Sequence, residues 1–287
     1  MFAIITRELR TYFQTPIGYV FMGLFLVISG FFFTVGNLFS GSSNYSSFLQ
    51  SILFIYLLAV PLLTMRLLSE ERRQKTDQLL LTSPITVTQI VLGKFFAAFG
   101  VFLLTLVVTI AYAVVVGIFG DLAVWQTVGG YIGFTFLGAA FISVGILVST
   151  ITENQVASAF FTFFALLLIW FLNLIKSIVP TDPIASTVFA AVVVVGLAAF
   201  FFVNTRSWIV TGVVGVIGAI ALVVLHLVQP SVFDGLIPNV LDWFSLLERF
   251  QGFALGLLKV EDIAFYLSFT AAFLFVTVRL IEKRRWS

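Results

Sequence analysis

The chain is poor in the residues that carry most protein chemistry. Its 287 residues include no cysteine, which excludes disulfides, thiolate catalysis and cysteine-ligated metals, and only one histidine, His226. The sequence has no glycine-rich phosphate loop ending in Gly-Lys-Ser or Gly-Lys-Thr, no His-Glu-x-x-His zinc helix and no Ser-His-Asp motif. The lone histidine and the scattered carboxylates form no ligand cluster. We therefore expect a non-catalytic chain that itself binds no cofactor and no metal.

Charge is scarce as well. Charged residues make up 10% of the chain and the net charge is +2, and no basic stripe interleaved with aromatic residues appears, so no nucleic-acid partner is expected. Hydrophobic residues make up 61%, and 35 of them are phenylalanines. A soluble globule would expose far too much apolar surface at this composition. The composition predicts an all-α integral membrane protein that has the lipid bilayer as its solvent.

Eight apolar runs are long enough to cross a bilayer as helices, which predicts a polytopic helical bundle in a single transmembrane domain, residues 1–287. The first run is interpreted as a span rather than a signal peptide, because it is long and no small-residue cleavage site follows it. Residues 184–228 form an extra hairpin in this interpretation; the alternative is six spanning helices plus a re-entrant hairpin. The predicted spans are residues 17–39, 48–68 with a kink at Pro61, 95–119, 124–148, 156–175, 184–203, 208–228 and 263–281.

Two further segments are amphipathic rather than spanning. In residues 1–15 the apolar side chains share one helical face, and Pro16 ends the helix, which predicts an interfacial helix along the membrane surface. Residues 229–260 mix prolines, acidic residues and aromatic residues, so we expect them to lie at the outer membrane interface. Gly133, Gly138 and Gly145 in the fourth run indicate close helix packing.

The basic residues give the orientation. Of the 15 Lys and Arg residues, all but Lys176, Arg249 and Lys259 fall on one side of the eight-helix topology. The positive-inside rule places that side in the cytoplasm, so both termini and the charged loop after residue 68 are expected there. The predicted location is the inner or plasma membrane of a bacterial cell.

The predicted spans contain no Asp, Glu, Lys or Arg deep in the bilayer, and His226 lies near the outer end of its run. Secondary transporters driven by protons or sodium need buried ionisable groups for the coupling ion. A passive channel is disfavoured because the spans lack polar stripes. Any transport energy is therefore expected to come from another chain.

The most highly charged stretch, residues 69–83, lies between two long apolar runs. Six charged residues precede three leucines, which suits a short helix with one wet face and with Ser69 as its N-cap. Pro84 ends this helix, and Thr86 with Gln89 predicts a capping box that starts the next one. The same pattern fits a solvated connector that keeps positive charge on the cytoplasmic side.

This stretch resembles the signature region of ABC-2 type ABC transporter permeases, in particular the gliding-motility-associated permeases. The matching residues are Pro61, residues 63–66, Glu70, Glu71, Thr76, Leu79, Leu80, residues 82–84 and residues 91–94, and near the end of the chain residues 247–250 and 266–270. The resemblance implies that residues 69–83 are a cytoplasmic coupling helix that sits on the ATPase subunit. The implied ATPase-coupling residues are Glu70, Glu71, Arg73, Lys75, Thr76, Asp77, Leu79, Leu80 and Leu81.

A second loop, residues 149–155, resembles the second cytoplasmic loop of the same family, and Glu153 joins the implied ATPase-coupling set on that ground. From the residues alone, the alternative is that Glu153 is simply part of a helix cap. Thr152 followed by Gln155 predicts another capping box there.

The resemblance also implies the partners. A complete transporter would contain two ATPase subunits, which hold ATP and magnesium, and a second permease chain, as a homodimer or a heterodimer. An extracytoplasmic accessory subunit and membrane lipid complete the expected partners. The implied function is coupling of ATP hydrolysis to substrate movement, with export as the expected direction; the alternative is a force-transmitting or assembly subunit that moves no solute.

Overall fold

The computed structural model describes the chain except for residues 76–84, 180–181, 206–207, 229–232, 234 and 286–287. Most of its described residues lie in helices and none lies in a strand, which confirms the predicted all-α class. The chain forms two compact units, residues 1–169 with 246–287, and residues 170–245.

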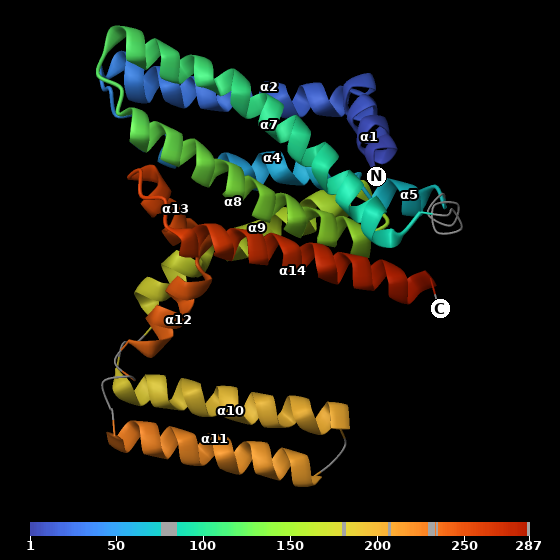
Figure 1. Ribbon diagram of the computed structural model, residues 1–287, viewed down its shortest axis with the longest axis vertical. Coiled ribbons are helices and arrows are strands. Elements are labelled where there is room, and N and C mark those ends of the chain that lie inside the picture. Colours follow the sequence, from blue (N-terminus) through green and yellow to red (C-terminus); the bar gives the residue numbers. More distant parts are fainter. Residues whose placement is uncertain (76–84, 180–181, 206–207, 229–232, 234, 286–287) are drawn as a thin grey trace. The chain divides into compact units, whose positions relative to one another are not determined.

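The larger unit contains most of the helices. They are α1 (Phe2–Gln14), α2 (Pro16–Phe33), the π-helix η1 (Thr34–Phe39), α3 (Tyr45–Ser51), α4 (Ile55–Thr64), α5 (Ser69–Arg73), α7 (Val87–Phe119), α8 (Val124–Ile151), the first part of α9 (Gln155–Ile178), α13 (Leu246–Ala254) and α14 (Val260–Arg285). Helix α5 lies at the same end as α1 and the C-terminal part of α14, and α13 lies at the opposite end with the turn between α7 and α8 (Figure 1). We call these the α5 end and the α13 end.

Five helices among the described residues are long and apolar enough to cross a membrane, and a bent pair makes up to six. The first, Pro16–Phe39, coincides within one residue with the first predicted span, residues 17–39. The count of eight stays a prediction. The other four are Val87–Phe119, Val124–Ile151, Gln155–Lys176 and Val260–Lys283, and the pair is Tyr45–Ser51 with Ile55–Arg73.

The large bend of the second span lies before α4, while Pro61 lies inside α4 and the predicted kink there stays a prediction. The two halves of the pair meet at 57° across residues 52–54. There the amide of Ile55 bonds to Ile52 and that of Leu57 to Phe54, a three-residue spacing typical of a tightened 3₁₀ turn. The bend therefore comes from this turn and not from the proline.

Helix α8 is the centre of the larger unit, with α4, α7, α13 and α14 packed around it. A Cβ on Gly138 would come within 2.4 Å of the Phe102 ring, and one on Gly145 within 2.3 Å of the Thr64 hydroxyl. Larger side chains would push these helices apart, which confirms the predicted close packing through glycine. Beside them the buried Tyr56 hydroxyl donates a 2.5 Å hydrogen bond to the Phe134 carbonyl.

Helix α13 belongs to this packing too. It buries Leu246, Leu247, Phe250, Phe253 and Ala254, mostly against α8. Its attachment to α14 includes a 2.7 Å ion pair between Arg249 and Asp262. The second half of the predicted interfacial segment 229–260 is thus anchored in the bundle by apolar side chains.

The smaller unit contains the end of α9 with α10 (Pro183–Thr205), α11 (Trp208–Val228) and α12 (Leu236–Phe244). Helices α10 and α11 occupy the positions of the predicted extra hairpin and pack side by side. Lys176 of α9 and Asp242 of α12 form an ion pair at 2.5 Å.

Candidate functional site

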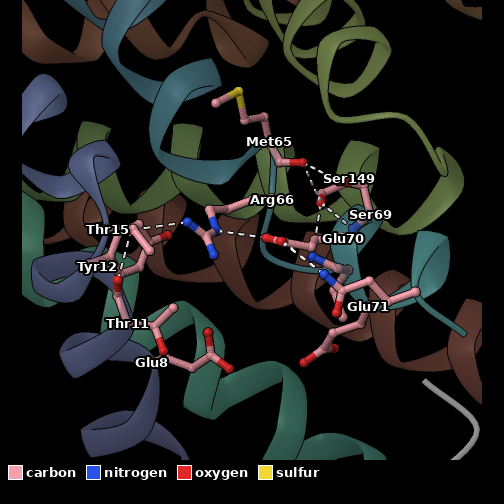
Figure 2. A network of polar contacts seen from close by, with 12 residues as sticks. Glu8, Thr11, Tyr12, Thr15, Met65, Arg66, Ser69, Glu70, Glu71 and Ser149 are labelled. Atoms are coloured by element: carbon pink, nitrogen blue, oxygen red, sulfur yellow. Dashed lines mark hydrogen bonds and ion pairs between the residues drawn. The ribbon is translucent and has the colours of Figure 1, made fainter. Parts of the chain in front are cut away.

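The N-terminus of helix α5 is capped by a side chain from another helix. The expectation that Ser69 caps it is wrong: the Ser69 hydroxyl donates back to the Met65 carbonyl. The Ser149 Oγ of α8 instead accepts hydrogen bonds from the amides of Leu68 and Ser69, both at 3.1 Å (Figure 2). These amides have no partner within the helix, so α8 satisfies the start of α5.

The end of α5 also differs from the prediction of one helix over residues 69–83. The helix ends at Arg73, and Lys75 has a positive φ of 55°, a left-handed conformation that terminates an α-helix. Residues 76–84 lie outside the described residues.

A buried lysine holds α5 to two other helices. The Lys94 Nζ of α7 lies 2.8 Å from Glu71 of α5 and 3.1 Å from Glu8 of α1. Arg7 lies 3.1 Å from Glu8 and 3.5 Å from Glu71. We call Arg7, Glu8, Glu71 and Lys94 the charge cluster; its two acids and two bases balance.

Burial decides how much these ion pairs matter. The Lys94 side chain is only 2% exposed, Glu8 is 12% and Glu71 16% exposed, so water replaces a lost partner poorly. Helix α5 carries Glu70, Glu71, Arg72 and Arg73 within five residues, which places it outside the hydrocarbon. Burial raises the pKa of the Glu71 carboxyl, and the Lys94 ammonium opposes that rise.

A close approach of backbones brings the cluster together. A Cβ on Gly93, next to Lys94, would lie 2.7 Å from the Ile4 side chain of α1. Ile4 and Glu8 are four residues apart and share a face of α1. The glycine therefore lets α1 come near enough to α7 for Glu8 to reach the Lys94 ammonium.

A second connection joins α4 and α5 to the end of α1. The Arg66 Nε forms a 3.0 Å ion pair with Glu70, and its Nη1 donates to the Thr15 hydroxyl at 3.0 Å (Figure 2). The Tyr12 hydroxyl donates to the Leu63 carbonyl at 2.6 Å. Tyr12 of the predicted apolar face is thus buried in packing, together with Ile4.

A third connection joins α5 to the last turn of α8. The Arg72 guanidinium donates to the carbonyls of Thr150 at 3.1 Å and Ile151 at 2.9 Å, and pairs with Glu153 at 2.5 Å. These carbonyls form the negative end of the α8 dipole, where a cation is favourable. Arg72 therefore acts as a C-terminal cap for α8.

Glu153 contributes through that pair and not through the predicted capping box. Helix α9 begins at Gln155, and the Asn154 Oδ1 accepts the Val156 amide at 2.9 Å. The Thr152 hydroxyl donates back to Val148 within α8. The capping box predicted for Thr152 and Gln155 is therefore wrong, whereas the one predicted for Thr86 and Gln89 is confirmed.

The structure brings only part of the predicted site together. Glu70, Glu71 and Glu153 take part in the contacts above, while Arg73 and Lys75 are exposed on and after α5. Five predicted residues lie outside the described residues: Thr76, Asp77, Leu79, Leu80 and Leu81.

Sequence reasoning missed Arg72, Ser149, Arg66 and most of the charge cluster. One signal was available: Lys94 is the single charged residue of the 33-residue helix α7. A lone cation at the start of an apolar helix indicates a buried partner. The acids that meet it, at positions 8 and 71, have no recognisable spacing from it.

The arrangement suits mechanical coupling rather than catalysis. Among the described residues no group of three or more histidines and acids could hold a metal ion. The charged groups pair with one another and with helix ends. They thereby connect α1, α4, α5, α7 and α8 at the α5 end. The chain is thus a polytopic helical membrane protein with a charged, tightly linked end.

A comparison with protein families identifies the class further. The family model described as ABC-2 family transporter protein matches residues 38–185, just over half of the 287 residues, and the chain belongs to this family. It is therefore a membrane permease of an ABC transporter, a subunit type that is generally non-catalytic. The matched residues include α5, Lys94 and Glu153. No curated protein matches the chain.

Proposed function

We propose that α5 and the residues after it couple this permease to a separate ATPase subunit. Membership of the ABC-2 family implies association with an ABC ATPase. The observation that carries the proposal is that α5, five residues long, is joined by polar contacts to α1, α7 and α8 and, through Arg66, to the turn after α4. A short charged helix with so many attachments is suited to receive a force and pass it on.

The route of that force follows from the contacts. Ser149 and Arg72 hold α5 to the last turn of α8, and Lys94 holds it to the first turns of α7. Long helices move as rigid elements, so displacement of α5 tilts α7 and α8 together. ATP-driven closure of the ATPases then changes the packing around α8, the central helix of the larger unit.

We assign the surface contacts with the ATPase to residues of this segment that lie outside the charge cluster. Arg73 and Lys75 are exposed. With Thr76, Asp77, Leu79, Leu80 and Leu81 they supply the proposed contacts: the leucines apolar ones, Thr76 a hydroxyl group, and the charged residues ionic ones. Glu70, Glu71 and Glu153 act by transmitting motion through their partners rather than by touching the ATPase.

The complete assembly in this proposal has two ATPase subunits that hold ATP and magnesium, and two permease chains. The α5 end faces the cytoplasm of a bacterial cell and the transport direction is export. The finer subfamily we propose is that of the gliding-motility-associated permeases, on the resemblance of residues 61–94 and 247–270.

One observation favours a second candidate function, transmission of force to an extracytoplasmic accessory subunit without solute movement. Phe250 and Phe253 of α13 are fully buried, and Phe253 packs against Gly133 of α8. Helix α8 is thus attached to α5 at one end and to α13 at the other. A partner bound near residues 229–260 would receive the motion of α8 through α13.

The test uses the full chain co-expressed with its candidate ATPase. Arg73→Glu and Leu80→Asp alter the proposed contact surface, and Arg279→Glu makes the same charge change on an exposed arginine of α14 as a control. We expect the first two variants to lose the co-purified ATPase or its hydrolysis response, while the control keeps both. Equal behaviour of all three variants, each with an unchanged unfolding temperature, would contradict the coupling role of this segment.

A further inference from the structure

Two adjoining hollows lie at the α13 end of the larger unit. One is a polar pocket of about 280 Å³ between the start of α3 and the start of α8, and the other is an apolar groove of about 500 Å³ between α7 and α8. Thr127 lines both. Known small-molecule sites have volumes of about 300 to 1,000 Å³. The groove falls within this range, and the polar pocket is just below it. The two hollows therefore adjoin at Thr127, one with a polar lining and the other with an apolar lining.

The polar pocket is lined by hydrogen-bonding groups and one carboxylate. Ser43, Asn44 and Gln126 offer hydroxyl and amide groups, and Asp121 is the one charged residue among its described lining residues. The loop that carries Ser43 is held in place, since the Asn37 amide donates to the Ser42 carbonyl at 2.8 Å. This pocket is built to meet a polar group that carries positive charge.

The groove has the opposite character. Its lining includes Ile110 and Ala113 of α7 and Val128, Ile132 and Phe136 of α8. From Thr127 to Phe136 it follows α8 for about 13 Å at the usual rise per residue. The groove thus runs from the helix ends toward the middle of the bundle. A lipid acyl chain takes the same direction from the membrane surface inward.

A hydrogen-bonded pair of tyrosines joins the linings of the two hollows. Tyr45 lines the pocket and Tyr131 the groove, and their hydroxyls lie 2.7 Å apart. The Tyr131 hydroxyl also lies 3.1 Å from that of Thr109. Because these hydroxyls satisfy one another, the groove presents ring surface and no unpaired polar atom at this point.

Exposed aromatic residues mark the depth of the site. Phe119, at the end of α7, is 85% exposed and Trp125, at the start of α8, is 79% exposed. Aromatic side chains gather at the membrane–water interface. Asp121 lies between them in the sequence, so the polar pocket is at headgroup depth and the groove at acyl-chain depth.

We propose that the pocket and groove bind one phospholipid of the adjacent leaflet, with a headgroup ammonium paired to Asp121 and one acyl chain along Val128 and Ile132. The ammonium selects a phosphatidylethanolamine-type lipid over an anionic one, because the described lining residues of the pocket carry no basic side chain to meet a net negative headgroup. The site depends on membrane insertion alone and is independent of the proposed ATPase coupling.

The occupancy test uses the full chain in nanodiscs that contain phosphatidylethanolamine with a photoreactive diazirine in its acyl chain. We expect labelled peptides to map to Ile110 and Ala113 of α7 and to Val128 and Ile132 of α8. Val128 lies at the exposed edge of the groove, so Val128→Trp fills the groove. Labelling of the groove residues should then fall to the level measured for exposed α7 residues outside the groove. Val107→Trp, on that surface and outside the groove, is the matched control and should leave labelling unchanged.

The headgroup test compares unlabelled phosphatidylethanolamine and phosphatidylglycerol as competitors. A partly exposed ion pair predicts a preference of about two- to five-fold for the former, which Asp121→Asn should remove. Labelling that is uniform along α7, that ignores Val128→Trp, or that shows no headgroup preference overturns the proposal. Crosslinks between two copies through residue 128 would overturn it too, by showing a second chain in the groove. No ATP is present, so failure of the coupling proposal leaves these results unaffected.

Discussion

Replacing Lys94 by methionine should be the most disruptive single change at the α5 end. Methionine has a similar length and fills the same space, so the variant removes charge with little change in packing. It leaves Glu8 and Glu71 with Arg7 as their shared cationic partner, at 3.1 and 3.5 Å. The balanced charge cluster then carries one excess negative charge in a site with little water.

The expected magnitude follows from burial. Removing one partner of a buried ion pair costs about 3 to 5 kcal/mol, and the slight exposure of both carboxylates favours the lower figure, about 3 kcal/mol. The larger unit has about 210 residues. At about 2.1 cal/mol/K of unfolding entropy per residue, that loss lowers the unfolding temperature by roughly 7 °C.

The measurement is thermal unfolding of the full chain in detergent, with Arg279→Ala as the control. Arg279 pairs with Glu282 on the exposed surface of α14, where such a pair contributes about 1 kcal/mol or less. Adding Glu71→Gln to Lys94→Met should recover part of the loss, because it removes the excess negative charge. A fall no larger than that of the control, or two losses that simply add, would refute the view that Lys94 is a buried ionic link.

Three smaller changes test the packing and capping around α8 by the same measurement. Gly145→Ala should destabilise by about 1 to 3 kcal/mol because its Cβ overlaps a side chain of α4, whereas Gly23→Ala, with nothing within 4 Å, should be neutral or slightly stabilising. Ser149→Ala leaves two amides at the start of α5 without an acceptor and should cost about 1 to 3 kcal/mol; no loss would show that water replaces it. Arg72→Ala should cost more than Glu153→Gln, because the arginine also caps the α8 carbonyls while the glutamate is largely exposed; equal losses would contradict the cap.

Local features of the fold could be predicted from the sequence. The end of α1 just before Pro16, the capping box at Thr86 and Gln89 and the long apolar helices all depend on neighbouring residues, and each is present. The bend in the second span could not be predicted in the same way. Pro61 was the one local signal for a kink, and no comparable signal marks residues 52–54, where the chain bends at a tightened turn before α4.

The candidate site was predictable in position but not in its contacts. The run of charges after residue 68 located α5, and Glu71 was among the predicted residues. Its partners could not be found by spacing, because Lys94 lies 23 residues further on and Glu8 lies 86 residues before Lys94. Long-range ion pairs follow from how helices pack, and no periodicity in one segment records them.

The position of Lys94 has a consequence for the order of synthesis. When α1 and α5 leave the ribosome, Glu8 and Glu71 have no buried cation to meet, since Lys94 belongs to the following helix. N-terminal parts of a chain emerge at about 5 to 20 residues per second, so this wait lasts seconds. The ion pairs that Lys94 makes with Glu8 and Glu71 therefore form only after the start of α7 has been synthesised, so α1 and α5 are joined through Lys94 late.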